Sequence, residues 1–167
     1  MEINIRTALC PGDSITASRI YARSWRVGYR GLLPDSVLSH IQDDTWVDKL
    51  NDNYITHRLE LAILSLNGED AGAASYGYAR DIVDKTKGEI VSFYFLQPYW
   101  GSGCAGALMD HAIDRLRQIG CRRFRLWVLR ENVRARRFYE KYGFSLSGRE
   151  MLSEVKGTPA TLYEYSL

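Results

Sequence analysis

The most constraining feature of this sequence is a glycine-rich turn between a β-prone stretch and an amphipathic helix. Residues 89–96 (EIVSFYFL) are rich in Val, Ile, Phe and Tyr, which favour strands. The turn 101–106 (GSGCAG) follows, and residues 105–119 then place apolar side chains at helical spacing. A glycine turn at a helix start points consecutive amides at one place, where the helix adds partial positive charge. The segment predicts a pyrophosphate-binding turn or, alternatively, a tight strand-to-helix turn without a ligand.

Two common phosphate-binding patterns do not fit this turn. No Gly-Lys-Ser or Gly-Lys-Thr follows it, which excludes a P-loop. The sequence has no strand-Gly-x-Gly-x-x-Gly unit that opens a parallel βαβ repeat, and no acidic residue closes the next strand. A dinucleotide is therefore not favoured as the ligand.

The remaining segments alternate between strand and helix patterns and indicate one mixed fold. Asn67-Gly68 separates two apolar runs and is typical of a type I′ hairpin. Helix starts are expected near Asp13 or Ser14, at Pro34-Asp35 and at Asn132. We expect an α+β (mixed α/β) fold, with a central mixed, mostly antiparallel sheet of about six to seven strands flanked by about four helices. The expected strands are residues 2–7, 59–66, 71–79, 89–96, 123–129, 144–149 and 160–166.

Length and composition bound the class of protein. The chain has 167 residues, of which 46% are hydrophobic and 25% charged, and this suits one globular domain over residues 1–167. Its net charge of +2 is too small to indicate a polyanionic partner. It has no signal-peptide pattern and no apolar run of the roughly 20 residues that span a membrane. We therefore expect a cytoplasmic protein with no membrane partner.

The three cysteines form no recognisable cluster. Cys10, Cys104 and Cys121 are odd in number, and no pair has the C-x-x-C spacing. This pattern argues against a disulfide framework and against a structural zinc site, while three reduced thiols are typical of a cytosolic protein. No group of His, Cys and Asp residues has the spacing of metal ligands either, so we expect no metal.

Two segments carry a resemblance to a known family. Residues 97–108 (QPYWGSGCAGAL) resemble the acyl-CoA pyrophosphate loop of the Gcn5-related N-acetyltransferases (GNAT), Q/R-x-x-G-x-G/A. Gly103 and Ala105 match this motif, whereas Trp100 replaces the usual Gln or Arg. Residues 131–144 are similar to the second GNAT signature, N-x-x-A-x-x-F-Y-x-x-x-G-F, at Asn132, Ala135, Phe138, Tyr139, Gly143 and Phe144. The resemblance extends over about residues 2–166.

The resemblance implies acetyl-CoA as the cosubstrate, without a metal. In this family the amides of the turn hold the pyrophosphate, and the preceding strand lines the thioester. The residues implied to bind acetyl-CoA are Phe93, Tyr94, Phe95, Gly101, Ser102, Gly103, Cys104, Ala105, Gly106, Asn132, Ala135, Phe138 and Tyr139.

Tyr139 is implied as a general acid. Attack of a neutral amine on a thioester expels a thiolate, and a CoA thiol should titrate near ~8.5, against ~10 for tyrosine. A positioned tyrosine can protonate the thiolate as it forms, and the family has a tyrosine at this place. Without the resemblance, Tyr139 would be interpreted as a core aromatic on an amphipathic helix. Asn132 is a candidate helix N-cap, and the resemblance adds a bond to the pantetheine or to a water beside it.

Glu89 is the candidate general base. It opens the strand expected to line the thioester, where many relatives place a glutamate that acts through water. A carboxylate in a half-closed cleft would have a raised pKa and could take a proton from the amine. The alternative interpretation is a solvated glutamate at a strand end.

Four aromatic residues are candidates for the walls of the acceptor pocket, because amphipathic aromatic side chains often line such pockets. The alternative for each is a place in the hydrophobic core. These candidate substrate-binding residues are Trp25, Tyr29, Tyr76 and Tyr78.

The second signature lies in a basic region. One of Arg134, Arg136 and Arg137 could meet the 3′-phosphate of CoA. The alternative is a solvated basic face, and a nucleic-acid partner has weaker support.

The resemblance implies transfer of an acetyl group from acetyl-CoA to a primary amine of a small molecule or peptide, by direct attack in a ternary complex. Two alternatives stay open: a protein Nα-acetyltransferase, which shares both motifs, and a non-catalytic acyl-CoA-binding module. A homodimer is compatible with the family, and nothing in the sequence decides it. The sequence does not identify the acceptor.

Overall fold

The computed structural model describes residues 1–9, 11–81 and 83–167, so Cys10 lies outside the described residues. The sheet has the strand order β1-β2-β3-β4-β5-β7-β6, and only the β4–β5 pair is parallel. The expected mixed, mostly antiparallel sheet of six to seven strands is confirmed. The strands are β1 (Ile3–Thr7), β2 (Glu60–Leu66), β3 (Glu69–Tyr78), β4 (Lys87–Phe95), β5 (Arg123–Leu129), β6 (Ser145–Val155) and β7 (Thr158–Ser166).

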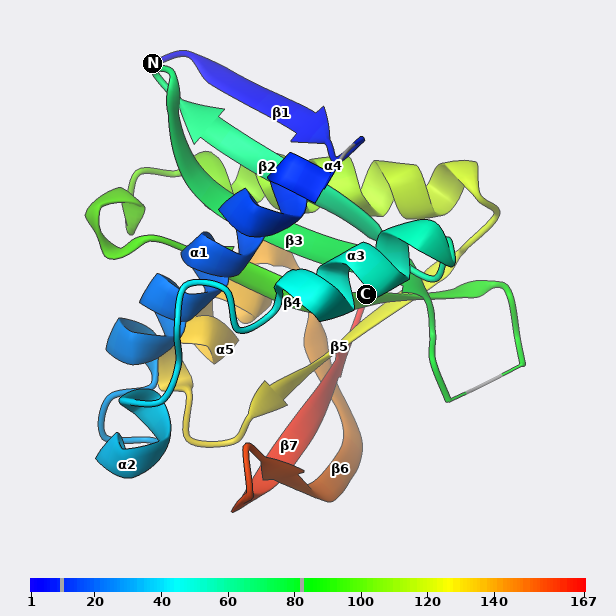
Figure 1. Ribbon diagram of the computed structural model, residues 1–167. Helices are drawn as coiled ribbons and strands as arrows, with labels where there is room; N and C mark the ends of the chain where they lie inside the picture. The colour runs from blue at the N-terminus through cyan, green and yellow to red at the C-terminus, as the bar shows by residue number, and fades with distance from the viewer. Residues whose placement is uncertain (10, 82) are drawn as a thin grey trace.

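Helices cover both faces of this sheet (Figure 1). Helices α1 and α3 pack on one face, against β3, β4 and β2, while α4 packs on the other face, against β1 to β4. The aromatic residues of α5 join the core on the α4 face. The helices are α1 (Pro11–Gly28), α2 (Asp35–Leu38), α3 (Val47–Ile55), α4 (Cys104–Gln118) and α5 (Val133–Tyr142), with a 3₁₀ turn η1 (Gln97–Tyr99) before α4.

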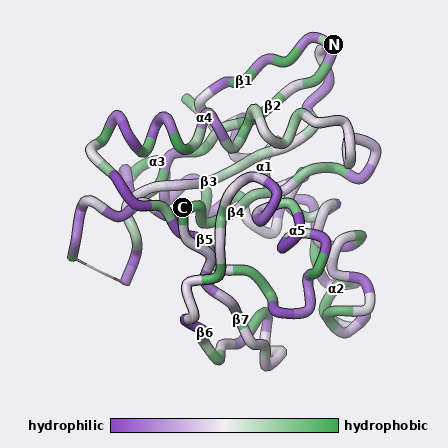
Figure 2. The backbone as a smooth tube through the Cα atoms, turned by 180° about the vertical axis from the view of Figure 1, so that it is seen from behind, coloured by the Kyte–Doolittle hydropathy of each residue, from purple (hydrophilic) through white to green (hydrophobic). Residues whose placement is uncertain are grey.

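Helix α4 shows how the sequence pattern produces this layering. Hydrophobic and hydrophilic residues alternate along it at helical spacing (Figure 2). Leu108, Ala112 and Leu116 are completely buried against the sheet, as their spacing of four residues predicts. Gly120 follows the helix with a φ of 98°, which suits a glycine at a helix C-terminus. The burial of the apolar face of α4 fixes the start of this helix, and therefore the glycine turn, against the sheet.

The hairpin turns follow local backbone preferences. Asn67 and Gly68 have φ values of 51° and 87°, as both central positions of a type I′ turn require. Strand β6 is longer than the predicted strand 144–149. The register shifts between Leu146 and Glu150, and Gly148 there has a φ of 85°. This irregularity interrupts the alternation of side chains, so the sequence pattern stops before the strand does.

Candidate active site

The sheet opens between β4 and β5. In this pair, residues Lys87–Ile90 of β4 bond to residues Arg123–Leu126 of β5. Beyond Leu126, β5 pairs with β7 alone. On its other side, the β3–β4 register shifts and leaves Val91 as an extra residue of β4. A bulge bends the strand that contains it, so β4 turns away from β5. The backbone of residues 91–95 then faces a cleft on this side instead of a neighbouring strand.

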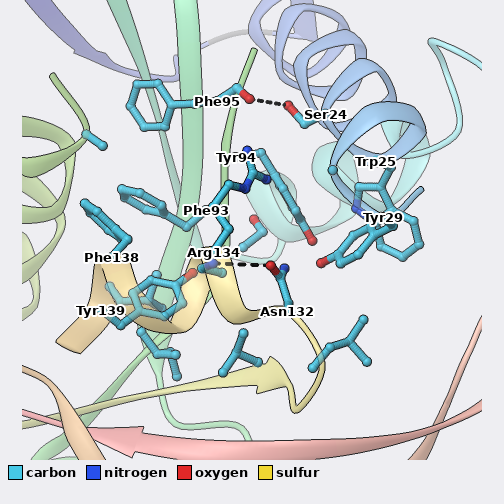
Figure 3. A pocket seen from close by; sticks show the side chains of 18 of the residues that line it. Ser24, Trp25, Tyr29, Phe93, Tyr94, Phe95, Asn132, Arg134, Phe138 and Tyr139 are labelled. Atoms are coloured by element: carbon cyan, nitrogen blue, oxygen red, sulfur yellow. Dashed lines mark hydrogen bonds between the residues drawn. The ribbon is translucent and has the colours of Figure 1, made fainter. Parts of the chain in front are cut away.

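A cavity of about 370 Å³ occupies this opening. It lies between the end of α1, strands β4 and β5, the glycine turn and the start of α5. In Figure 3, Phe93, Phe138 and Tyr139 lie on one side of it, and Trp25 and Tyr29 lie on the other. The predicted residues that line it are Trp25, Tyr29, Phe93, Tyr94, Phe95, Gly101, Gly103, Ala105, Asn132, Ala135, Phe138 and Tyr139.

The carbonyl of Phe95 holds three walls of the cavity together. Ser24 of α1 donates its hydroxyl to this oxygen at 2.9 Å (Figure 3), and the indole Nε1 of Trp100 donates to it at 2.9 Å. One acceptor therefore joins α1, β4 and the segment before the glycine turn. The sequence analysis missed Ser24, because a serine in a helix carries no signal of a partner 71 residues away.

The glycine turn has the backbone shape that was expected. Gly101 and Gly103 have φ values of 77° and 85°, which residues with a side chain rarely adopt. Gly103 is the N-cap of α4 and provides no side-chain cap. A Cβ at either glycine would meet no atom within 4 Å, so the side-chain side of both residues is open. The Ser102 hydroxyl accepts a long hydrogen bond of 3.4 Å from the Cys104 amide. A helix start whose N-cap residue has no side chain can admit an anionic group.

Three neighbours in the turn contribute differently. The Ser102 hydroxyl donates to the Tyr99 carbonyl at 2.7 Å, and the Cys104 side chain is fully buried. Neither Ser102 nor Cys104 lines the cavity, and Gly106 has no side chain. Any contact of these residues with a phosphate would therefore come from their backbone amides.

Arg134 places a positive charge at this end of the cavity. Its guanidinium carbon lies 3.3 Å from the ring centroid of Trp100, a cation–π contact. A Cβ built on Gly28 would be 2.9 Å from its Nη2 atom, so the guanidinium lies directly against the backbone of Gly28 and would have to shift if a side chain were added. The arginine thus spans from α5 to α1 across the cavity. Trp100, which replaces the Gln or Arg of the family motif, serves as the platform for an arginine from another element.

The other two candidate arginines have different positions. Arg136 donates to the Tyr165 hydroxyl at 3.0 Å and to the Arg130 carbonyl at 2.9 Å. Arg137 is exposed, and neither it nor Arg136 lines the cavity. Of the three, only Arg134 faces the cavity.

Tyr139 lies in an apolar part of the cavity wall. It is buried, and its ring contacts Phe138 and Phe93 at centroid distances of 5.5 Å and 6.5 Å, both edge-on. Burial raises the pKa of Tyr139 well above its ordinary value, and the nearby charge of Arg134 opposes this rise. The hydroxyl therefore carries its proton at neutral pH.

Asn132 caps α5 by accepting a hydrogen bond from the Ala135 amide at 3.2 Å, as predicted.

Tyr29, in the opposite wall of the cavity, also keeps its proton at neutral pH. Burial raises the pKa of Tyr29 to about 12, although hydrogen bonding to Tyr94 lowers it in part. The ring of Tyr29 packs edge-on against Trp25 at 4.7 Å. Both predicted residues therefore line the cavity as neutral, amphipathic side chains.

Comparisons with known proteins agree with this geometry. The family model described as "Acetyltransferase (GNAT) family" matches residues 20–144, which include both signatures. The chain belongs to this family. Uncharacterized N-acetyltransferases of Mycobacterium tuberculosis and Mycobacterium bovis are 40% identical over 60 residues, which is 36% of this chain and 38% of the length of those relatives.

Solved structures show the same fold. An N-acetyltransferase from Staphylococcus aureus has a TM-score of 0.76 at 19% identity, covering 100% of this chain and 98% of that one. The paia N-acetyltransferase from Thermoplasma acidophilum, solved in complex with coenzyme A, has a TM-score of 0.72 at 19% identity, covering 98% of both chains. The yncA protein from Salmonella typhimurium, solved with acetyl-CoA, has a TM-score of 0.70 at 20% identity, covering 99% and 92%.

The expectation of a raised pKa for Glu89 in this GNAT chain is wrong. Its side chain is 1% exposed and does not line the cavity. It accepts hydrogen bonds from Arg80 at 2.7 Å and Arg125 at 3.0 Å. Burial would raise the pKa of Glu89, but these two arginines outweigh it and hold the pKa below the ordinary value. A carboxylate held ionised by two guanidinium groups is a poor proton acceptor.

Tyr76 and Tyr78 also lie outside the cavity. Tyr76 is buried near His111 of α4, with their ring centroids 6.4 Å apart. Tyr78 donates its hydroxyl to the Ile119 carbonyl at 2.9 Å. The core alternative holds for Tyr76, because side chains alternate across a strand and position 76 faces α4.

Among the described residues, no helix is long and apolar enough to cross a membrane, and no cluster of three or more His, Cys, Asp or Glu residues could hold a metal.

Glu89→Gln should affect stability more than catalysis. Removing one partner of a buried ion pair typically costs about 3–5 kcal/mol, so we expect a lower free energy of unfolding and a kcat within threefold of wild type. Because the pKa of Glu89 is lowered in the folded state, its stabilising effect is complete above its ordinary pKa of 4.5 and is lost as the pH falls further. Denaturant unfolding between pH 3 and 7 should therefore show the two proteins converging at the acidic end.

Glu150→Gln is the matched control, because Glu150 is exposed on β6. We expect it to leave stability unchanged. If Glu89→Gln keeps its stability and loses kcat more than tenfold, Glu89 acts as the base after all.

Gly103→Asp should weaken binding of CoA. It adds a side chain at a φ of 85° and a negative charge in front of the α4 amides. We expect the dissociation constant measured by titration calorimetry to rise at least tenfold, about 1.4 kcal/mol. Gly148→Asp controls for backbone strain, since Gly148 has the same φ of 85° and equally open surroundings. Equal affinity of both variants would contradict a phosphate site at the turn.

Proposed function

We propose that this protein transfers an acetyl group from acetyl-CoA to a primary amine by direct attack in a ternary complex. The observation that carries the proposal is the cavity between β4 and β5, which has the glycine turn before α4 at one end and the buried Tyr139 in its wall. Membership of the GNAT family supports the same assignment.

Each part of acetyl-CoA has a matching part of the cavity. The pyrophosphate lies on the amides of 101–106, with the guanidinium of Arg134 beside it as a charged donor. The pantetheine arm contains amide groups, and these pair with the backbone of residues 91–95 that β5 leaves uncovered. The acetyl group then lies among Phe93, Phe138 and Tyr139, where apolar walls exclude water.

The reaction transfers one acyl group and is accompanied by three proton transfers. The neutral amine nitrogen attacks the thioester carbon and forms the C–N bond, and the C–S bond breaks as the tetrahedral intermediate collapses. The leaving sulfur takes the proton of the Tyr139 hydroxyl, and the new amide nitrogen loses a proton to water. A proton from solvent then restores the tyrosine.

The surroundings of Tyr139 suit this proton transfer. Burial raises the pKa of its hydroxyl, but the same apolar walls also disfavour the thiolate and raise the pKa of the CoA thiol. The pKa values of the tyrosine hydroxyl and of the CoA thiol therefore shift in the same direction, and the difference between them stays smaller than if burial acted on the tyrosine alone. The charge of Arg134 stabilises the tyrosinate that forms for a moment.

A single assay separates this function from its alternatives. Titration with CoA measures binding, and release of free thiol from acetyl-CoA with a panel of polyamines, amino acids, aminoglycosides and peptide N-termini measures transfer. Turnover with a small-molecule amine supports the proposal. Turnover with peptide N-termini only indicates an Nα-acetyltransferase, and binding without any turnover indicates an acyl-CoA-binding module.

Tyr139→Phe should lower kcat and leave the affinity for acetyl-CoA nearly unchanged. The substitution removes one oxygen and keeps the ring packed against Phe93 and Phe138. General acid catalysis contributes about 10²–10⁴ in rate, so kcat should fall by that order. The measurement is kcat of both forms across neutral and mildly alkaline pH. Because the raised pKa keeps Tyr139 protonated there, the ratio of the two rates should stay constant.

Tyr142→Phe is the matched control. Tyr142 lies on the same helix, and its hydroxyl donates to Asp110 at 2.5 Å outside the cavity. We expect this variant to keep the wild-type kcat. A wild-type kcat for Tyr139→Phe at every pH would assign protonation of the thiolate to water.

A further inference from the structure

A second, larger cavity lies on the α1 and α3 side of the sheet. Its volume is about 820 Å³, and its walls come from α1, α3, the segment after α3, and the facing parts of β3 and β4. In the proposed function, acetyl-CoA occupies the first cavity and leaves this one free for another molecule. The inference below rests on the proposed function, because it concerns the second substrate of that reaction.

The two cavities meet at β4. Val91, Ser92 and Tyr94 line both of them. These residues lie at and just after the bulge, where β4 leaves β5. A molecule in the second cavity would therefore lie against the same stretch of β4 that lines the first cavity, at the point where the strands separate.

The floor of the second cavity carries hydroxyl groups. The Ser92 hydroxyl lies 2.5 Å from the Tyr21 hydroxyl and 2.5 Å from the Ser75 hydroxyl. All three residues line the cavity. These groups can donate or accept a hydrogen bond, so the floor suits a polar end of a substrate such as an amine.

The rim of the second cavity is strongly basic. Among the described lining residues there is no aspartate or glutamate, although the whole chain has 20 of them against 22 lysines and arginines. Composition therefore does not account for the bias. The basic lining residues are Lys49, His57, Arg58, Arg80 and Lys85.

The two lysines of this set have no acidic partner within the described part of the chain. Arg80 pairs with Glu89 at 2.7 Å, and Arg58 pairs with Asp52 at 3.7 Å. For Lys49 and Lys85, no carboxylate oxygen of a described residue lies within 4 Å. The ammonium of Lys85 lies 4.7 Å from the ring centroid of Tyr78, which directs it to the cavity wall.

Helix α3 presents its polar stripe to this cavity. Lys49, Asn53 and Thr56 follow one another at spacings of four and three residues and all line it. Lys85 approaches from the connection between β3 and β4. The charges therefore come from two separate elements that converge on one space.

We propose that the acceptor amine carries an anionic group, a carboxylate or a phosphate, which Lys49 and Lys85 bind while the amine lies near Ser92. Anions are attracted to a concave basic surface that lacks carboxylates. The same positive surroundings disfavour an ammonium ion, so the amine binds in its neutral, reactive form. This removes the need for a carboxylate base in the cleft, where Glu89 is absent.

The test compares acceptors that differ in one charge. 4-(Aminomethyl)benzoate, its carboxamide and 1,4-bis(aminomethyl)benzene present the same benzylic amine opposite an anionic, neutral or cationic group. We expect kcat/KM for the anion to exceed that of the amide at least tenfold, and the cation to be the poorest acceptor. The corresponding phosphonate distinguishes the two sources of negative charge.

Variants connect this preference to the lysines. Lys49→Met with Lys85→Met should raise KM for the anionic acceptor about tenfold, leave its kcat within twofold and abolish the preference over the amide. Replacing both lysines with arginine should retain the preference. Lys141→Met is the control, because Lys141 is exposed on α5 and lines neither cavity.

A binding measurement separates failure of this inference from failure of the proposed function. The N-acetyl products are titrated into the complex of the protein with CoA, which requires no turnover. Preferential binding of the anionic product supports the inference even if no acceptor is acetylated, a result that would count against the function alone. Equal binding of the three products, or a preference for the cation, overturns the inference while acetyl transfer can stand.

Discussion

The separation of β4 from β5 is the constraint on which the rest of the structure depends. At one end, Arg125 is 1% exposed and pairs with Glu89 at 3.0 Å and Glu164 at 3.3 Å, so charges hold β4, β5 and β7 together. At the other end, the bulge at Val91 turns β4 away. A strand pair that is closed at one end and open at the other exposes backbone groups that need a partner. The cleft that we propose for acetyl-CoA is a consequence of this geometry.

The two ends of this strand pair have opposite electrostatics. The closed end contains ionised groups that neutralise one another, which is the reason that Glu89 is ionised and does not reach the cleft. The open end is apolar, and burial there keeps Tyr29 and Tyr139 protonated. Among the described residues that line the cavity, Arg134 is the only lysine or arginine. Its guanidinium lies on the ring of Trp100, beside the glycine turn. Charge on this strand pair is therefore confined to the closed end and to Arg134, and the wall around Tyr139 is apolar.

Local signals in the sequence predicted the shape of the first cavity's walls well. The glycine turn, the N-cap Asn132 and the aromatic face of α5 depend on neighbours within a few residues, and each has the expected position. The predictions for Glu89 and Tyr76 failed for another reason. Which face of β4 or β3 a side chain occupies depends on strand register and on the bulge, and a shift of one residue exchanges the faces.

The sequence by itself determined the order of elements, the turn that can hold a phosphate and the helix that carries the tyrosine, because these follow from short-range periodicity and backbone preference. Only the tertiary structure decided which charges meet. Arg125 lies 36 residues from Glu89 and 39 from Glu164, and Lys49 and Lys85 reach one cavity from separate elements. Such pairings depend on how the sheet twists and on where its strands part, and no local pattern encodes the distance between side chains so far apart in the chain.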